Sequence, residues 1–149
     1  MRRLRLKDTK MLRSLIALAA LTTSTVPAFA QSTAPTYPAI PLLSTSTTVV
    51  GEKIEYPKGD AHVTSVIVTL APGARTILHT HGVPMFAYIL DGEITVDYGT
   101  HGKRTYRKGA SLMEAMQVAH FGENTGSEPV RLIAVYMGSS TAKDVVPVK

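Results

Sequence analysis

The chain has 149 residues, no cysteine and a formal net charge of +5. Six of its sixteen Lys and Arg lie in residues 1–13, so that residues 31–149 carry ten basic against ten acidic side chains and are formally neutral. The missing cysteines exclude a disulfide framework, and the neutral body of the chain gives no support for nucleic-acid or anionic-membrane binding.

The N-terminal residues 1–30 have the order of a secretory signal peptide. A basic segment precedes a short apolar stretch at Leu15–Leu21, and the small-residue pattern Ala28-Phe29-Ala30 follows. We expect cleavage after Ala30 on a Sec-type route, with Arg2-Arg3 leaving twin-arginine export as the alternative. The apolar stretch is too short to span a bilayer. The sequence therefore predicts a periplasmic or secreted protein with no stable membrane insertion after cleavage.

The rest of the chain is long enough for one domain with one core. Residues 31–48 are rich in Ser, Thr, Pro and Ala, which indicates a tether or arm. We expect the domain at 49–138 and a tail or last edge strand at 139–149. The apolar residues Tyr37, Ile40, Leu42 and Leu43 have no obvious partner, so residues 37–50 are a candidate dimer contact.

In chain order, short β-branched or alternating segments predict strands at 63–70, 75–81, 85–90, 93–98 and 130–137. Gly, Pro, Asn and Asp separate these segments, most clearly at Asp91-Gly92, where a hairpin needs a positive φ at the glycine. Beyond the signal region, the sequence shows no 3.6-residue period of helical length. We predict an all-β, antiparallel barrel or jelly roll.

Three of the five histidines are candidate metal ligands. His79 and His81 flank Thr80, and residues i and i+2 of a strand point to the same face. His120 supplies a third imidazole from another strand, and three neutral imidazoles suit a first-row divalent metal. The alternative is that they are surface or hydrogen-bonded histidines in a metal-free barrel. His62 starts a strand and His101 lies in a turn, so we expect both to be exposed.

The spacing around these histidines resembles the two motifs of the cupin superfamily. Gly73, His79, His81 and Gly92 match the first motif, with Met85 in place of its Glu. Gly109, His120 and Asn124 match the second, with Ala115 and Gln117 in place of its Pro and Gly. The resemblance covers about residues 49–138 and implies a small β-barrel of jelly-roll type that is lined by the three histidines.

Met85 stands where the resemblance implies a carboxylate ligand. It is either an apolar wall that leaves coordination positions open, or a thioether ligand that would favour copper, or a sign that a carboxylate elsewhere has taken over the role. The expected metal is otherwise Fe, Mn, Zn or Ni.

Glu114 is the candidate catalytic acid or base. It lies in the apolar segment 111–116, shortly before His120. If it faces the interior, burial would raise the pKa of its carboxyl towards neutrality and suit it to proton transfer. If it faces outward, it is an ordinary solvated side chain. Phe86, Tyr88 and Gln117 complete the predicted pocket with Met85.

These residues predict an exported metal-binding protein that acts on a small organic molecule. Cupins with three-histidine sites include dioxygenases, and related sites catalyse isomerisation or ring opening, so the resemblance implies chemistry of one of these kinds. The alternative function is a module that binds a small ligand or a metal without turnover.

Overall fold

The computed structural model describes residues 37–149, and all of its strands lie in one compact unit, Ala39–Lys149. The expected signal peptide at 1–30, and residues 31–36 of the expected arm, lie outside the described residues. Within residues 37–149, no helix is long and apolar enough to cross a membrane. The strands and the one short 3-10 helix, η1, are β1 (Ala61–Leu70), β2 (His79–Thr80), β3 (Met85–Asp91), β4 (Glu93–Asp97), η1 (Gly99–His101), β5 (Lys103–Arg107), β6 (Ser111–Met113), β7 (Phe121–Glu123), β8 (Val130–Ser139) and β9 (Val146–Pro147).

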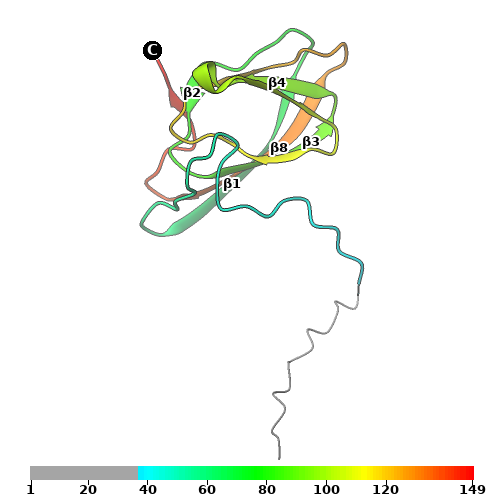
Figure 1. Ribbon diagram of the computed structural model, residues 1–149. Coiled ribbons are helices and arrows are strands. Elements are labelled where there is room, and N and C mark those ends of the chain that lie inside the picture. The colour runs from blue at the N-terminus through cyan, green and yellow to red at the C-terminus, as the bar shows by residue number, and fades with distance from the viewer. Residues whose placement is uncertain (1–36) are drawn as a thin grey trace, which may run out of the picture. The chain divides into compact units, whose positions relative to one another are not determined.

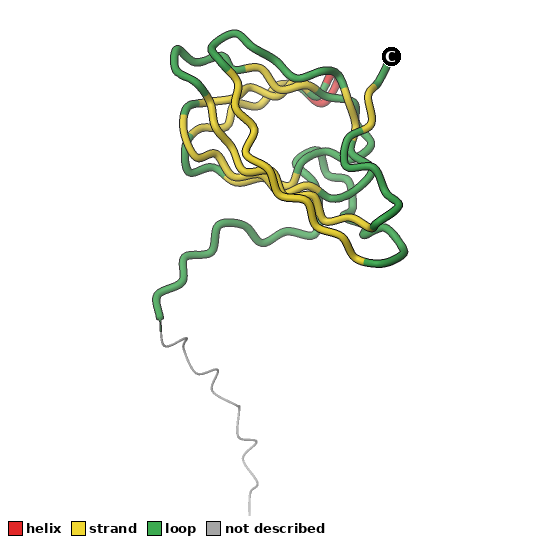
Figure 2. Tube along the Cα trace, turned by 180° about the vertical axis from the view of Figure 1, so that it is seen from behind, coloured by secondary structure: helices red, strands yellow, loops and turns green. Residues whose placement is uncertain are grey.

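The strands form two main antiparallel layers (Figures 1 and 2). One layer has the strand order β1-β8-β3-β6, the other has the order β5-β4-β7, and β2 pairs with β9 in a small third sheet. The expected all-β antiparallel fold is confirmed, and its sheets are those of a jelly roll. The alternative of a barrel is not confirmed in its closed form, because the strands of residues 37–149 pair in three separate sheets.

The core lies between the two layers and follows from the alternation of side chains along each strand. Met85, Ala87 and Ile89 of β3 are buried, whereas Phe86 and Tyr88 between them are only half-buried. In the facing layer, Ile94 and Val96 of β4 are buried. Odd residues of β3 and even residues of β4 therefore face each other across the interior.

The hairpin between β3 and β4 turns as the sequence predicts. Gly92 has φ +72°, and a Cβ there would lie 2.8 Å from the carbonyl oxygen of Pro129. Both the backbone conformation and the close approach therefore require glycine.

The strand expected at 75–81 is much shorter in the structure. Only His79 and Thr80 form β2, with isolated bridges from Arg75 to Glu123 and from His79 to His120. Its pairing partner, β9, has only two residues, and towards the segment that contains β7 there are only isolated bridges, so little ladder is available to extend β2. This edge of the fold carries the histidines.

Candidate metal centre

Three buried histidines meet at one end of the interior. His79 lies in β2, His81 follows that strand directly, and His120 immediately precedes β7. Their ring centroids are 4.6 to 5.2 Å apart, and one ligand nitrogen from each lies within 4.8 Å of the others. The structure thus brings together the three histidines that the sequence analysis selected, in a group that could hold a metal ion.

Backbone carbonyls fix the tautomer of all three rings. The Nδ1–H of His79 donates to the Ile77 carbonyl at 2.7 Å, and that of His120 donates to the Val118 carbonyl at 2.8 Å. The Nδ1–H of His81 donates to the carbonyl of Asp144 at 2.8 Å. Because a carbonyl oxygen only accepts, each Nδ1 must carry the hydrogen, which leaves the lone pair on Nε2. This is the hydrogen-bond arrangement that orients metal-bound histidines.

Burial keeps the three imidazoles neutral. It lowers the pKa of His79 and of His120, and it lowers the pKa of His81 to about 4. The Nε2 of His81 is buried without a hydrogen-bond partner, which is costly unless another group satisfies it. Neutral imidazoles with free Nε2 atoms form the donor set that a divalent transition metal needs.

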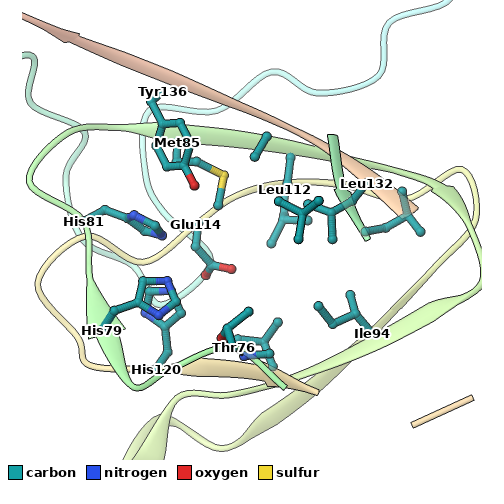
Figure 3. A pocket seen from close by; sticks show the side chains of 16 residues that line it. Thr76, His79, His81, Met85, Ile94, Leu112, Glu114, His120, Leu132 and Tyr136 are labelled. Carbon is teal, nitrogen blue, oxygen red and sulfur yellow. Dashed lines mark hydrogen bonds between the residues drawn. The ribbon is translucent and has the colours of Figure 1, made fainter. Parts of the chain in front are cut away.

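The histidines open onto a cavity of about 80 Å³ between the two layers (Figure 3). Such a space holds a few water molecules or a compact organic group. Its wall is mainly aliphatic, and among its lining residues the sole carboxyl group belongs to Glu114. The lining residues are Val68, Thr76, His79, His81, Met85, Ala87, Ile89, Ile94, Val96, Leu112, Glu114, His120, Gly122, Leu132, Ala134 and Tyr136.

Glu114 faces the interior rather than solvent. Its side chain is buried, and its carboxyl group points into the cavity beside the histidines (Figure 3). Its Oε1 accepts the Ala115 N–H at 2.8 Å, and burial raises the pKa of the carboxyl. Of the two orientations that the sequence left open, the structure has the inward one.

Met85 and Glu114 are neighbours across two strands. The backbone N–H of Glu114, just beyond β6, donates to the carbonyl of Met85 at the start of β3 at 2.9 Å. Both side chains line the cavity. A carboxyl group is therefore present next to the position where the cupin motif carries its glutamate, but it comes from the residue that follows the adjacent strand, β6.

Three residues that the sequence analysis assigned to the pocket lie elsewhere. Phe86 and Tyr88 are half-buried on the other face of β3, because alternate side chains of a strand point to opposite faces. Gln117 is exposed, and only its backbone is engaged, through its N–H. His62 and His101 are exposed, as expected.

Tyr136, Asp144 and Glu52 contribute to this site but are not among the residues predicted from the sequence. Tyr136 lines the cavity, and its even position in β8, in step with Leu132 and Ala134, would have indicated it. Asp144 and Glu52 carried no local signal. Asp144 supports His81 through its backbone, and Glu52 reaches the site across more than sixty residues of chain.

The two-layered fold and the three-histidine group define a small, cupin-like protein. A family model for the cupin domain matches residues 66–136, and this chain belongs to the cupin superfamily. Among curated proteins, the search found no match.

Solved structures with a similar fold include enzymes of two kinds. An oxalate decarboxylase of Bacillus subtilis is 26% identical with a TM-score of 0.48, covering 58% of this chain and 24% of its own. That of Lactobacillus farciminis is 21% identical with a TM-score of 0.48, covering 58% and 26%. The polyketide cyclase of Streptomyces resistomycificus is 16% identical with a TM-score of 0.51, covering 61% and 63%. This chain thus spans about a quarter of the decarboxylases, and the likeness to the cyclase concerns the fold alone.

Proposed function

We propose that this protein is an exported, metal-binding cupin that acts on a small organic molecule. The observation that carries the proposal is the convergence of three Nδ1-protonated histidines on a cavity that also receives the Glu114 carboxyl. Neutral ligands, a proton-transfer group and an apolar wall are the parts that metal-assisted chemistry on a small substrate requires.

The histidines would hold the metal through Nε2, with Fe, Mn, Zn and Ni as candidates. When bound, such an ion supplies Lewis-acid polarisation of a carbonyl or enol oxygen, or a centre for dioxygen chemistry. The aliphatic wall excludes water from the reacting molecule, and Met85 is part of that wall. Isomerase or ring-opening chemistry and dioxygenase-like chemistry both fit these parts.

Glu114 would move the proton. Its Oε1 accepts the Ala115 N–H, which holds the carboxyl in place at the cavity. Burial raises the pKa of the carboxyl, so it keeps its proton to a higher pH than an exposed glutamate does, as a general acid must. Replacing Glu114 by Gln keeps the shape but removes this function.

The alternative is a binding module without turnover. The inward position of Met85 favours it, because the thioether fills the place of a charged ligand with an apolar group. Retained ligand binding in Glu114→Gln, together with no turnover by either form, would support the alternative.

Metal content tests the proposal directly. Elemental analysis of protein purified without a tag should find close to one equivalent of a divalent metal, and a chelator should lower the thermal midpoint. His81→Ala should lose the metal, whereas His101→Ala, which removes an exposed histidine, should keep it. Metal at trace level, with no effect of the chelator on stability, would contradict the proposal.

Export and dimer formation are further parts of the proposal. The mass of the protein recovered from the periplasm or medium should correspond to residues 31–149, starting after Ala30.

In the described part of the arm, the carbonyl of Leu42 accepts a hydrogen bond from the Ser111 hydroxyl of the domain at 2.7 Å, while the side chain of Ile40 is 85% exposed. Sizing chromatography should show a dimer for residues 31–149 and a monomer for residues 48–149. The same oligomeric state for both chains would exclude the arm as the dimer contact.

A further inference from the structure

A second carboxylate, that of the half-buried Glu52, lies outside the lining of the cavity. Glu52 Oε2 accepts the Met116 N–H at 2.7 Å, and its Oε1 accepts the N–H groups of Gln117 and Val118 at 2.8 and 3.0 Å. The Thr48 hydroxyl adds a bond to Oε2 at 3.1 Å. One side chain thus satisfies three consecutive backbone donors of a turn that is distant in sequence.

The same turn carries the backbone acceptors of two candidate ligands. The Met116 carbonyl accepts the backbone N–H of His81 at 2.9 Å, and the Val118 carbonyl accepts the Nδ1–H of His120 at 2.8 Å. The position of His81 and the ring orientation of His120 therefore depend on how residues 116–118 are held.

Peptide geometry links the carboxylate to His81. The Met116 carbonyl and the Gln117 N–H belong to one planar trans peptide, so they point in opposite directions. When Glu52 holds the Gln117 N–H, it directs the Met116 carbonyl towards His81 on the other side. Residues 115–118 contain no Pro that would fix this backbone by itself.

Glu52 is itself firmly placed. Its backbone N–H donates to the Thr48 hydroxyl at 3.1 Å, and its carbonyl accepts the Thr48 N–H at 2.8 Å. Val49, in the same loop, donates its N–H to the Met113 carbonyl at the end of β6 at 2.8 Å. Burial by itself would raise the pKa of Glu52, but its hydrogen bonds outweigh that effect and lower it, so the group stays ionised.

We propose that Glu52 is a positioning residue for the three-histidine centre, acting through the turn 116–118. This inference rests on the proposed metal function, because its main consequence is for metal affinity. Replacing a residue that orients metal ligands without contacting the metal typically weakens metal binding by about ten- to a hundredfold. A glutamine at this position would turn an NH₂ group towards backbone donors, so at least one of the three bonds is lost.

The test is a Zn²⁺ titration of the full mature chain against a competing chelator. Glu52→Gln should weaken Zn²⁺ binding by about 10- to 100-fold. Glu55→Gln is the matched control, because it removes one charge from the same segment at an exposed residue, whose ion pair with Lys53 measures 3.8 Å. It should change affinity less than about twofold. Equal affinity in wild type and Glu52→Gln would overturn the proposal.

A second measurement separates this proposal from the proposed function. In metal-free protein, the Nδ1–H proton signals of His79 and His120 can be followed by NMR. Glu52→Gln should speed the exchange of the His120 proton with water, while the His79 proton, bonded to Ile77, stays as in wild type. Unchanged exchange at His120 overturns the proposal even if no metal binds. If Glu52→Gln does not fold, Glu52→Asp, which keeps the charge but shortens the reach, should show the same selective effect.

Discussion

His79 and His120 form a mutual backbone pair, in which each N–H donates to the other's carbonyl, at 3.0 and 2.9 Å. Directly opposed residues of an antiparallel pair send their side chains to the same face, so this pairing alone brings two imidazoles to a ring distance of 4.6 Å. His81 has a different support, because its Nδ1–H donates to Asp144 in the C-terminal segment. The position of the three histidines therefore depends on the His79–His120 backbone pair, on the turn 116–118 and on the C-terminal segment around Asp144.

Gly82→Ala should displace the tail and weaken the centre. A Cβ on Gly82 would lie 2.5 Å from the Lys143 carbonyl oxygen, so the backbone next to Asp144 must move. We expect a loss of roughly 1–3 kcal/mol in unfolding free energy from overpacking, and about 10- to 100-fold weaker Zn²⁺ binding as the His81 bond is disturbed. Thr141→Ala, an exposed change in the same tail, is the control and should leave both quantities unchanged. Unaltered Zn²⁺ affinity in Gly82→Ala would show that the tail does not matter for the centre.

Met85→Leu should leave metal binding intact. If Met85 is only a wall, a hydrophobic residue of similar volume costs less than about 1.5 kcal/mol in unfolding free energy and does not touch the ligands. If its thioether were a ligand, affinity for Cu⁺ in particular would collapse. Parallel titrations with Zn²⁺ and Cu⁺ distinguish the two interpretations. A selective loss of Cu⁺ affinity would contradict the interpretation that Met85 is only an apolar wall residue.

Glu114→Gln should stabilise the metal-free protein at neutral pH. Because burial raises the pKa of this carboxyl above its ordinary value of 4.5, the unfolded chain ionises first as the pH rises, and folding becomes less favourable above that value. Below pH 4.5 the carboxyl is neutral in both states and the two proteins should be equally stable. Urea unfolding at pH 4 and pH 7 checks this, and a variant that is less stable than wild type at pH 7 would contradict it.

Glu52→Gln should have the opposite pH dependence. Its hydrogen bonds lower the folded-state pKa, so the carboxylate stabilises the fold above its ordinary value of 4.5 and loses that effect as the pH falls through the folded-state value. The difference in unfolding free energy between wild type and Glu52→Gln should therefore be largest near neutrality and shrink in acid. If this difference in unfolding free energy is constant from pH 7 to pH 3, the ionised form of Glu52 does not stabilise the fold more than the neutral form does.

Local patterns predicted much of the fold. The hairpin glycine, the strand at 85–90 and the buried parity of Met85 and Ala87 follow from turn chemistry and alternation, which act over a few residues. The same alternation shows why Phe86 and Tyr88 could not share the pocket with Met85. The short extent of β2 was not predictable, because it depends on its partner β9, which is more than sixty residues away in the chain, rather than on its own residues.

By itself, the sequence determined the antiparallel all-β class and the three histidines with their spacing, because residue type and strand period are local properties. Only the tertiary structure decided that Glu114 points inward, that Glu52 accepts hydrogen bonds from the turn 116–118 and that the carbonyl of Asp144 fixes the tautomer of His81. The bonds of Glu52 and Asp144 join residues more than sixty positions apart, and the orientation of Glu114 is set where β6 ends against β3. Their partners are chosen by the packing of whole sheets and loops, which no short sequence pattern encodes.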